Sequence, residues 1–253
     1  MYENGGGAMP GSGFDEWVAA FEAEKARREW IADPEWGHGV ELPAVVVRSL
    51  QKFQVGEDGD GANLRAKADL AGDAAYSAAV RLFVDEERNH ARLLAELLGA
   101  AGAPLLDGHW SDRIFVRVRR LLGLRTELMV LMVAELVAVE YYRSLRDGLA
   151  DPLAREVTGR ILRDERRHIP FHVQRLRQSF GEIAPSARPF AQLAWLLLAL
   201  AGALFVAVDH GPALHAVRAS RGRFLGAVAR HARVVGARMA AREGRAVADP
   251  QAG

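Results

Sequence analysis

The chain contains no cysteine among its 253 residues. This absence excludes disulfides, zinc–thiolate sites, iron–sulfur clusters and thiol nucleophiles. Any bound metal must therefore be held by Asp, Glu or His side chains, which suit iron, manganese or zinc. The lack of cysteine also agrees with a reducing compartment, and the first residues show no signal-peptide pattern. We therefore expect a cytoplasmic protein.

An excess of charge of one sign is also missing, because the formal net charge is only +1. Such a balance gives no overall attraction to nucleic acid, and we expect no nucleic-acid partner. Aromatic residues make up only 8% of the chain, whereas half of it is hydrophobic and rich in Ala and Leu. This composition favours an all-α protein with one large core, or one domain with an added subdomain.

Breaks at Gly and Pro divide the sequence into amphipathic segments. Residues 1–13 are rich in Gly and are predicted to be a disordered tail. The predicted helices cover residues 14–30, 42–70, 73–99, 114–149 (bent near Gly123), 152–179, 190–209 and 212–242. Asp73 and Asp151 are predicted N-caps, the second followed by Pro152. We expect an antiparallel four-helix bundle with an N-terminal helix within residues 14–180, and two additional C-terminal helices within residues 187–245.

Two of these helices carry the same short motif, Glu-x-x-His. It runs from Glu87 to His90 in the predicted helix 73–99, and from Glu165 to His168 in the predicted helix 152–179. Residues three apart on a helix share a face, so a carboxylate and an imidazole in this arrangement can bind one metal ion. One such motif is weak evidence, because Glu and His are ordinary surface residues. Two motifs on two long helices are stronger evidence.

The spacing around the helical turns supplies two further carboxylates. Glu57 and Glu87 lie 15 residues on either side of Gly72, and Glu135 and Glu165 lie 15 residues on either side of Ala150. In an antiparallel pair, equal distances from the turn mean equal height along the axis. Both hairpins therefore deliver one Glu and one Glu-x-x-His at the same level.

The same argument chooses between neighbouring residues. Glu140 is five residues from the matched height, which is about 7.5 Å along a helix. We therefore expect Glu135 to be the ligand and Glu140 to lie close behind the site. The argument also requires the helix that carries Glu57 to continue through Gly59 and Gly61. Four carboxylates brought so close together need cations, and two divalent ions would supply them.

This pattern resembles the ferritin-like di-iron carboxylate superfamily, in which two helices give one Glu each and two give Glu-x-x-His. The resemblance covers about residues 42–179. Within it, Glu86-Glu87-Arg88-Asn89-His90 and Asp164-Glu165-Arg166-Arg167-His168 look like the metal motifs of acyl-carrier-protein desaturases. Residues 56–70 look more like the first metal helix of aldehyde deformylating oxygenases. The chain is also similar to bacterial proteins described only as containing a ferritin-like domain.

The resemblance implies a role for each residue. Glu57, Glu87 and His90 would serve one metal, and Glu135, Glu165 and His168 the other, with Glu87 and Glu165 bridging and the four carboxylates as the catalytic residues. Asp164 would accept a hydrogen bond from a ligand His, and Glu86 is the matching residue in the other half. His172 and Glu140 complete the predicted outer set. For these four outer residues, an ordinary packing or surface role is the alternative.

The resemblance also implies a function. Two metal ions, Fe/Fe or Mn/Fe, would activate O2 to oxidise an apolar organic substrate, small or of acyl type, with electrons from an external donor. A ferroxidase or peroxide scavenger that handles iron is the first alternative. A non-enzymatic helical module with a structural metal is the second. An apolar pocket beside the metals would favour the oxidase, whereas a carboxylate-lined solvent path would favour iron handling.

The C-terminal segments are compatible with several roles. Residues 190–208 carry no charge, so they could form a membrane helix, a helix covering the bundle or the interface of a homodimer. The last helix is rich in Arg, which is typical of a solvated face. The same charge would suit an acidic partner such as an acyl carrier protein, or anionic lipid.

Overall fold

The structure of the chain is a computed structural model that describes residues 13–108 and 123–241. All of its regular elements in these ranges are helical: α1 (Phe14–Trp30), a short 3₁₀ helix (Trp36–His38), α2 (Ala44–Glu57), α3 (Ala62–Leu70), α4 (Ala74–Ala100), α6 (Leu124–Gly148), α7 (Pro152–Gly181), α8 (Arg188–Asp209), α9 (Gly211–Ala216) and α10 (Arg221–Ala240). The all-α prediction is confirmed. The predicted tail and the start of the predicted 114–149 helix lie outside the described residues.

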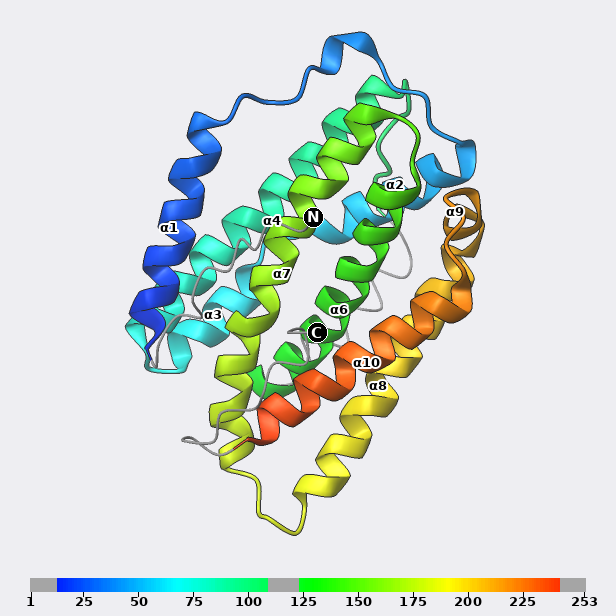
Figure 1. Cartoon of the computed structure of the whole chain (residues 1–253). Coiled ribbons are helices and arrows are strands. Elements are labelled where there is room, and N and C mark those ends of the chain that lie inside the picture. Colours follow the sequence, from blue (N-terminus) through cyan, green and yellow to red (C-terminus); the bar gives the residue numbers. More distant parts are fainter. Residues whose placement is uncertain (1–12, 109–122, 242–253) are drawn as a thin grey trace, which may run out of the picture.

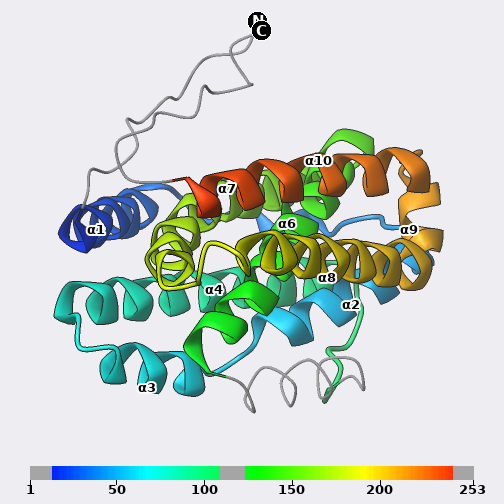
Figure 2. The same ribbon diagram turned by 90° about the horizontal axis from the view of Figure 1, so that it is seen from below.

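Helices α2, α4, α6 and α7 form the bundle that carries the predicted site. Helix α4 packs against α2 and α7, and α6 packs against α7, as Figures 1 and 2 show from two sides. Helix α1 lies along the outer side of α4, and the short α3 packs on α4 and α6. Helices α8 and α10 run side by side and cover α6 and α7 on another side (Figure 1).

Side-chain caps fix where two of the bundle helices begin. The Asp73 carboxylate accepts a hydrogen bond from the backbone N–H of Tyr76, and the Asp151 carboxylate accepts one from that of Ala154. Each bond satisfies an N–H that has no partner within its helix. Pro152 occupies the first turn of α7, where its missing N–H costs nothing. Both predicted N-caps are therefore confirmed.

The predicted helix over residues 42–70 is broken in the structure. Helix α2 ends at Glu57 and α3 begins at Ala62. Gly61 has a φ of 62°, which belongs to the left-handed region and not to a right-handed helix. A Cβ at Gly61 would lie 2.5 Å from a methyl carbon of Val84, so the position lies against α4 and leaves no open space. The expectation that the helix continues through Gly59 and Gly61 is wrong.

The predicted C-terminal helix is also divided. Helix α9 ends at Ala216, Arg218 takes a φ of 58°, and α10 begins after Ser220. Ser220 caps α10, because its hydroxyl accepts the backbone N–H of Arg223. The C-terminal extension therefore contains three helices within the described residues instead of two.

Helix α8 has two apolar faces of different exposure. Trp195, Ala199, Ala203 and Ala207 are buried and recur every four residues, whereas several large side chains between them are exposed: Leu197, Leu200, Leu204 and Phe205. By length and composition alone α8 could cross a membrane, with a mean hydropathy of 2.2. Core helices of soluble proteins pass the same test, but only 28% of this segment is buried.

Candidate metal centre

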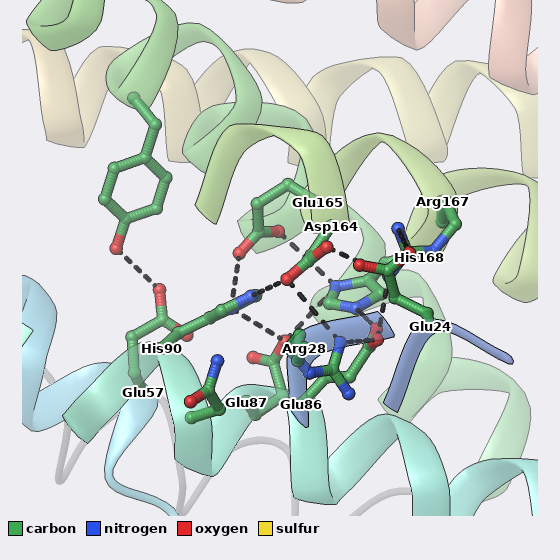
Figure 3. A network of polar contacts seen from close by, with 12 residues as sticks. Glu24, Arg28, Glu57, Glu86, Glu87, His90, Asp164, Glu165, Arg167 and His168 are labelled. Atoms are coloured by element: carbon green, nitrogen blue, oxygen red, sulfur yellow. Dashed lines mark hydrogen bonds and ion pairs between the residues drawn. The ribbon is translucent and has the colours of Figure 1, made fainter. Parts of the chain in front are cut away.

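The six predicted ligands converge inside the bundle, one from each of α2 and α6 and two from each of α4 and α7. Their potential ligand atoms form two groups, and within each group all atoms lie within 4.8 Å of one another. The first group comes from Glu57, Glu87, His90 and Glu165. The second comes from Glu87, Glu135, Glu165 and His168. Glu87 and Glu165 belong to both groups. The structure thus gives two adjacent sets of three carboxylates and one imidazole, with two carboxylates shared between them. Figure 3 shows five of these side chains: Glu57, Glu87, His90, Glu165 and His168.

The Nδ1 atoms of both histidines face these carboxylates. Nδ1 of His90 lies 3.2 Å from Glu165 Oε1 and 3.6 Å from Glu87 Oε1. Nδ1 of His168 lies 3.2 Å from Glu87 Oε1 and 3.3 Å from Glu135 Oε2. Both imidazoles are fully buried. Nδ1 is therefore the atom that each histidine can offer to a cation held between the carboxylates.

The other ring nitrogens face a second pair of carboxylates. Nε2 of His90 lies 3.3 Å from Asp164 Oδ2, and Nε2 of His168 lies 3.0 Å from Glu86 Oε2. Each pair joins α4 to α7. An ionised carboxylate at Nε2 keeps the proton there and leaves Nδ1 free to bind a metal. The structure thus places Asp164 and Glu86 behind the two histidines, where the sequence predicted them.

Two arginines balance the charge of this outer pair. Arg167 Nη2 lies 2.7 Å from Glu86 and 3.0 Å from Asp164. Arg28, on α1, bonds to Glu86 and lies 3.8 Å from Asp164. Glu24 on α1 lies 3.5 Å from Arg167 and completes the network (Figure 3). Helix α1 therefore contributes to the site, which the sequence pattern did not predict.

We call the four carboxylates of the two ligand groups, Glu57, Glu87, Glu135 and Glu165, the inner carboxylates. No Arg or Lys of the described residues pairs with them, and the pKa values of three of them are raised. Burial and the charge of Glu165 raise the pKa of Glu135 to about 8. Burial and the charge of Glu165 raise the pKa of Glu57, and burial and the charges of Glu57 and Glu165 raise that of Glu87. Burial opposes ionisation of Glu165 too, but its interactions with His168 and His90 bring its pKa below the usual range.

The surroundings of the outer carboxylates, Glu86 and Asp164, and of the two histidines favour the charged form of each group. Burial raises the pKa of Asp164, but the hydrogen bond from His90 and the nearby cations lower it to about 2. Hydrogen bonding and charge from His168 likewise lower the pKa of Glu86 against the effect of burial. Burial lowers the pKa of His90 and His168, but the carboxylates around them raise it well above its usual value.

Whether metal ions fit this site can be judged from three buried atoms. Glu87 Oε1, Glu165 Oε1 and His90 Nδ1 are buried and have no hydrogen-bond partner among the residues that the structure describes. Buried polar atoms normally have a partner, so unpaired ligand atoms that face one another need an explanation. Four Glu and two His are hard or borderline ligands that suit iron, manganese or zinc. Two divalent cations would satisfy these atoms and offset four negative charges.

Tyr142 contacts the cluster from α6. Its hydroxyl donates a 2.8 Å hydrogen bond to Glu57 Oε1, and the ring is fully buried. Its neighbour Tyr141 bonds to Ser49 Oγ instead, at 2.5 Å. The sequence favours a packing role for both tyrosines, with a redox or hydrogen-bond role as the alternative. Tyr142 lies seven residues after Glu135, two turns along the same helix, and this spacing is the signal that could have found it.

Two predicted outer residues differ in their surroundings. Glu140 lies 2.6 Å from Arg143 of its own helix and 3.0 Å from His231 of α10, so its contacts are with α6 and the C-terminal extension and not with the six predicted ligands. The five-residue offset from Glu135 turns it away. His172 is fully buried, and its Nε2 lies 3.8 Å from Glu135 Oε1. Burial and the charge of His168 lower the pKa of His172 to about 3.

An apolar pocket of about 260 Å³ lies beside the cluster, between α2, α6 and α8. The four carboxylates of the cluster, Glu57, Glu87, Glu135 and Glu165, are among its lining residues. The remaining wall is mostly apolar and includes Phe53, Leu131, Val133, Ala134, Val137, Ala138, Gly202, Phe205 and Val206. A carboxylate cluster that lines an apolar pocket is a typical arrangement for binding an apolar ligand next to reactive groups.

Comparisons with known proteins add no assignment. Neither a scan against models of protein families nor a search of curated proteins finds a match. The fold and the site therefore carry the functional argument: an all-helical bundle with a buried Glu/His cluster that could hold metal.

Proposed function

We propose that this protein binds two metal ions, iron being preferred, and uses O2 to oxidise an apolar organic substrate. The observation that carries the proposal is the unequal charge balance of the two carboxylate sets. Glu86 and Asp164 have arginine partners, whereas the four inner Glu have no Arg or Lys partner among the described residues and face His90 and His168. The inner set therefore needs added cations, and the outer set does not.

The chain's own residues would divide the work as the geometry suggests. Glu57 and His90 would hold one ion and Glu135 and His168 the other, with Glu87 and Glu165 common to both. Asp164 and Glu86 fix the two histidines, and Arg28 and Arg167 keep those outer carboxylates ionised. When bound, a pair of iron ions supplies the electrons and coordination sites for reduction of O2. The pattern resembles the ferritin-like di-iron superfamily in these respects.

The pocket favours an organic substrate over iron storage. Its wall is apolar except for the four Glu, Lys52 and His210. Lys52 is paired with Asp209 at 2.8 Å. Such a wall would hold an alkyl chain next to the cluster. An iron-handling protein would instead need an acidic path for Fe²⁺, and the wall of this pocket does not provide one.

Anaerobic loading with Fe²⁺ followed by exposure to O2 tests the proposal. We expect about two Fe per chain and O2 uptake that rises when medium-chain alkanes or aldehydes are present, with ¹⁸O from labelled O2 in an oxidised product. Unlimited Fe²⁺ oxidation with growing iron content, and no organic product, would support the ferroxidase alternative instead.

A further inference from the structure

The exposed face of α8 is the largest run of unpartnered apolar side chains on a described helix. Its members recur every three or four residues and are 43–74% exposed: Phe190 (74%), Leu193 (55%), Leu197 (58%), Leu200 (43%), Leu204 (55%) and Val208 (63%). We call these six side chains the α8 stripe. Contiguous apolar surface of this kind normally marks a contact with a protein or a membrane.

The opposite face keeps α8 attached to the protein. Trp195 is fully buried, and its Nε1 donates a 2.8 Å hydrogen bond to the Ala232 carbonyl of α10. A Cβ at Gly202 would lie 2.5 Å from Val133 of α6, so the two backbones are close. If α8 crossed a membrane by itself, it would lose these contacts. The helix is therefore arranged to lie flat, with the α8 stripe outward.

The charged side chains of the neighbouring helix α10 are all basic. Helix α10, which runs alongside α8 in Figures 1 and 2, contains no acidic residue. Its Arg221, Arg223, Arg230 and Arg233 are exposed, and the ion pairs of the described residues include none of these four. An apolar face beside unpaired cations is the pattern of a helix that lies in the surface of an anionic membrane.

We propose that α8 and α10 seat this protein on an anionic lipid surface, with the α8 stripe in the outer acyl region and the α10 arginines at the headgroups. A second copy is the competing occupant. In a two-fold dimer the same patch meets itself, which would bring two arginine-rich helices together without acids to offset them. Lipid headgroups supply the missing negative charge.

The apolar pocket agrees with this choice. Gly202, Phe205 and Val206 of α8 form one side of it, and the four inner Glu also line it. Lipid against α8 would place an apolar phase next to that side, whereas a second copy would cover it with protein. This step rests on the proposed function, but the charge and burial arguments for the lipid surface do not.

Vesicle co-sedimentation of the metal-free full chain tests the proposal. We expect binding to vesicles of phosphatidylglycerol and phosphatidylcholine, and much weaker binding to phosphatidylcholine alone. The double variant Leu197→Gln/Leu204→Gln should lower the partition coefficient by at least ten-fold. Leu70→Gln/Leu105→Gln makes the same change at two exposed leucines elsewhere and should bind like the parent. Arg223→Gln/Arg233→Gln should lower binding several-fold, and only to the anionic vesicles.

Several outcomes would overturn the proposal. One is a parent protein that stays in the supernatant with anionic vesicles. Another is equal binding by the α8 double variant, with its fold checked by circular dichroism. A third is a lipid-free dimer, seen by sedimentation velocity, that the α8 variant converts to a monomer, because the stripe would then belong to a second copy. Binding by metal-free protein that fails to load metal would leave this proposal standing and contradict only the proposed function.

Discussion

Oε2 of Glu86 on α4 lies 3.0 Å from Nε2 of His168 on α7. The reciprocal pair joins Asp164 on α7 to His90 on α4, at 3.3 Å. Each outer carboxylate directly precedes a ligand Glu in the sequence but orients the histidine of the opposite helix. The two halves of the site are thus interlocked, and under the proposed function a change on one helix should alter the affinity for the ion that the other helix would hold.

This crossed pairing predicts which ion each outer variant weakens. Asp164→Asn should reduce affinity for the ion at His90 by about 10- to 100-fold, and Glu86→Gln should do the same for the ion at His168. Co²⁺ titrations followed by absorption would compare each variant with His90→Ala and His168→Ala. If Asp164→Asn instead reproduces the His168→Ala spectrum, the pairing is not the one described.

Tyr141 and Tyr142 of α6 allow a controlled test of whether Glu57 binds a metal ion. Tyr142→Phe removes the hydrogen bond to Glu57, so we expect Mn²⁺ to bind on the order of ten-fold more weakly at one of the two sites. Tyr141→Phe removes the same hydroxyl from a tyrosine that bonds to Ser49, and should leave both affinities unchanged. Calorimetric titration measures both. Equal effects would indicate general loosening of α6 and not loss of a contact to a ligand.

The pKa of Glu135 predicts how metal-free stability depends on pH. This pKa rises from 4.5 to about 8 on folding, so the folded form holds the proton more tightly than the unfolded chain. The resulting stability is complete below pH 4.5 and is lost as pH rises toward 8. His90 and His168 also have raised pKa values and act in the same direction.

Thermal unfolding between pH 5 and pH 9 checks this dependence. We expect the melting temperature of the metal-free protein to fall across this range, and Glu135→Gln to show a smaller fall because its amide does not ionise. Two Mn²⁺ per chain should remove most of the loss, since cations stabilise the ionised carboxylates. A Glu135→Gln variant with the parent's pH profile would show that this group does not control it.

Filling the pocket should separate substrate binding from metal binding. Ala138 lines the pocket and is 7% exposed, whereas Ala201 is exposed on α8 and is not among the lining residues. Ala138→Phe should abolish the stimulation of O2 uptake by medium-chain alkanes or aldehydes but keep about two metals per chain. Ala201→Phe should leave both properties unchanged. Undiminished stimulation in Ala138→Phe would place the substrate elsewhere.

The sequence predicted which side chains converge better than it predicted the path of the chain that carries them. Helical spacing and the matched 30-residue separations were sufficient to select all six residues that the structure brings together. The assumption of a continuous helix after Glu57 was wrong, because Gly61 takes a left-handed conformation against Val84. Glu57 still reaches the cluster because it ends α2, which packs on α4 independently of α3.

Other parts of the site depend on packing between elements that no local pattern relates. Arg28 reaches Glu86 only because α1 folds back along α4, and the residues between α1 and α2 have no periodicity that indicates this. The contact between Glu140 and His231 likewise depends on how α10 crosses α6. Spacing along one helix defines a face, but it does not say which other helix will cover that face.

Metal content after anaerobic reconstitution tests the central claim most directly. The protein purified, stripped with chelator, incubated with excess Fe²⁺ and desalted should contain about two Fe per chain. Glu165→Ala, which removes a carboxylate common to both ligand groups, should not retain two, whereas Glu140→Gln, a buried carboxylate outside the cluster, should load like the parent. Fewer than about one Fe or Mn per chain in the parent, or two in Glu165→Ala, would contradict the account.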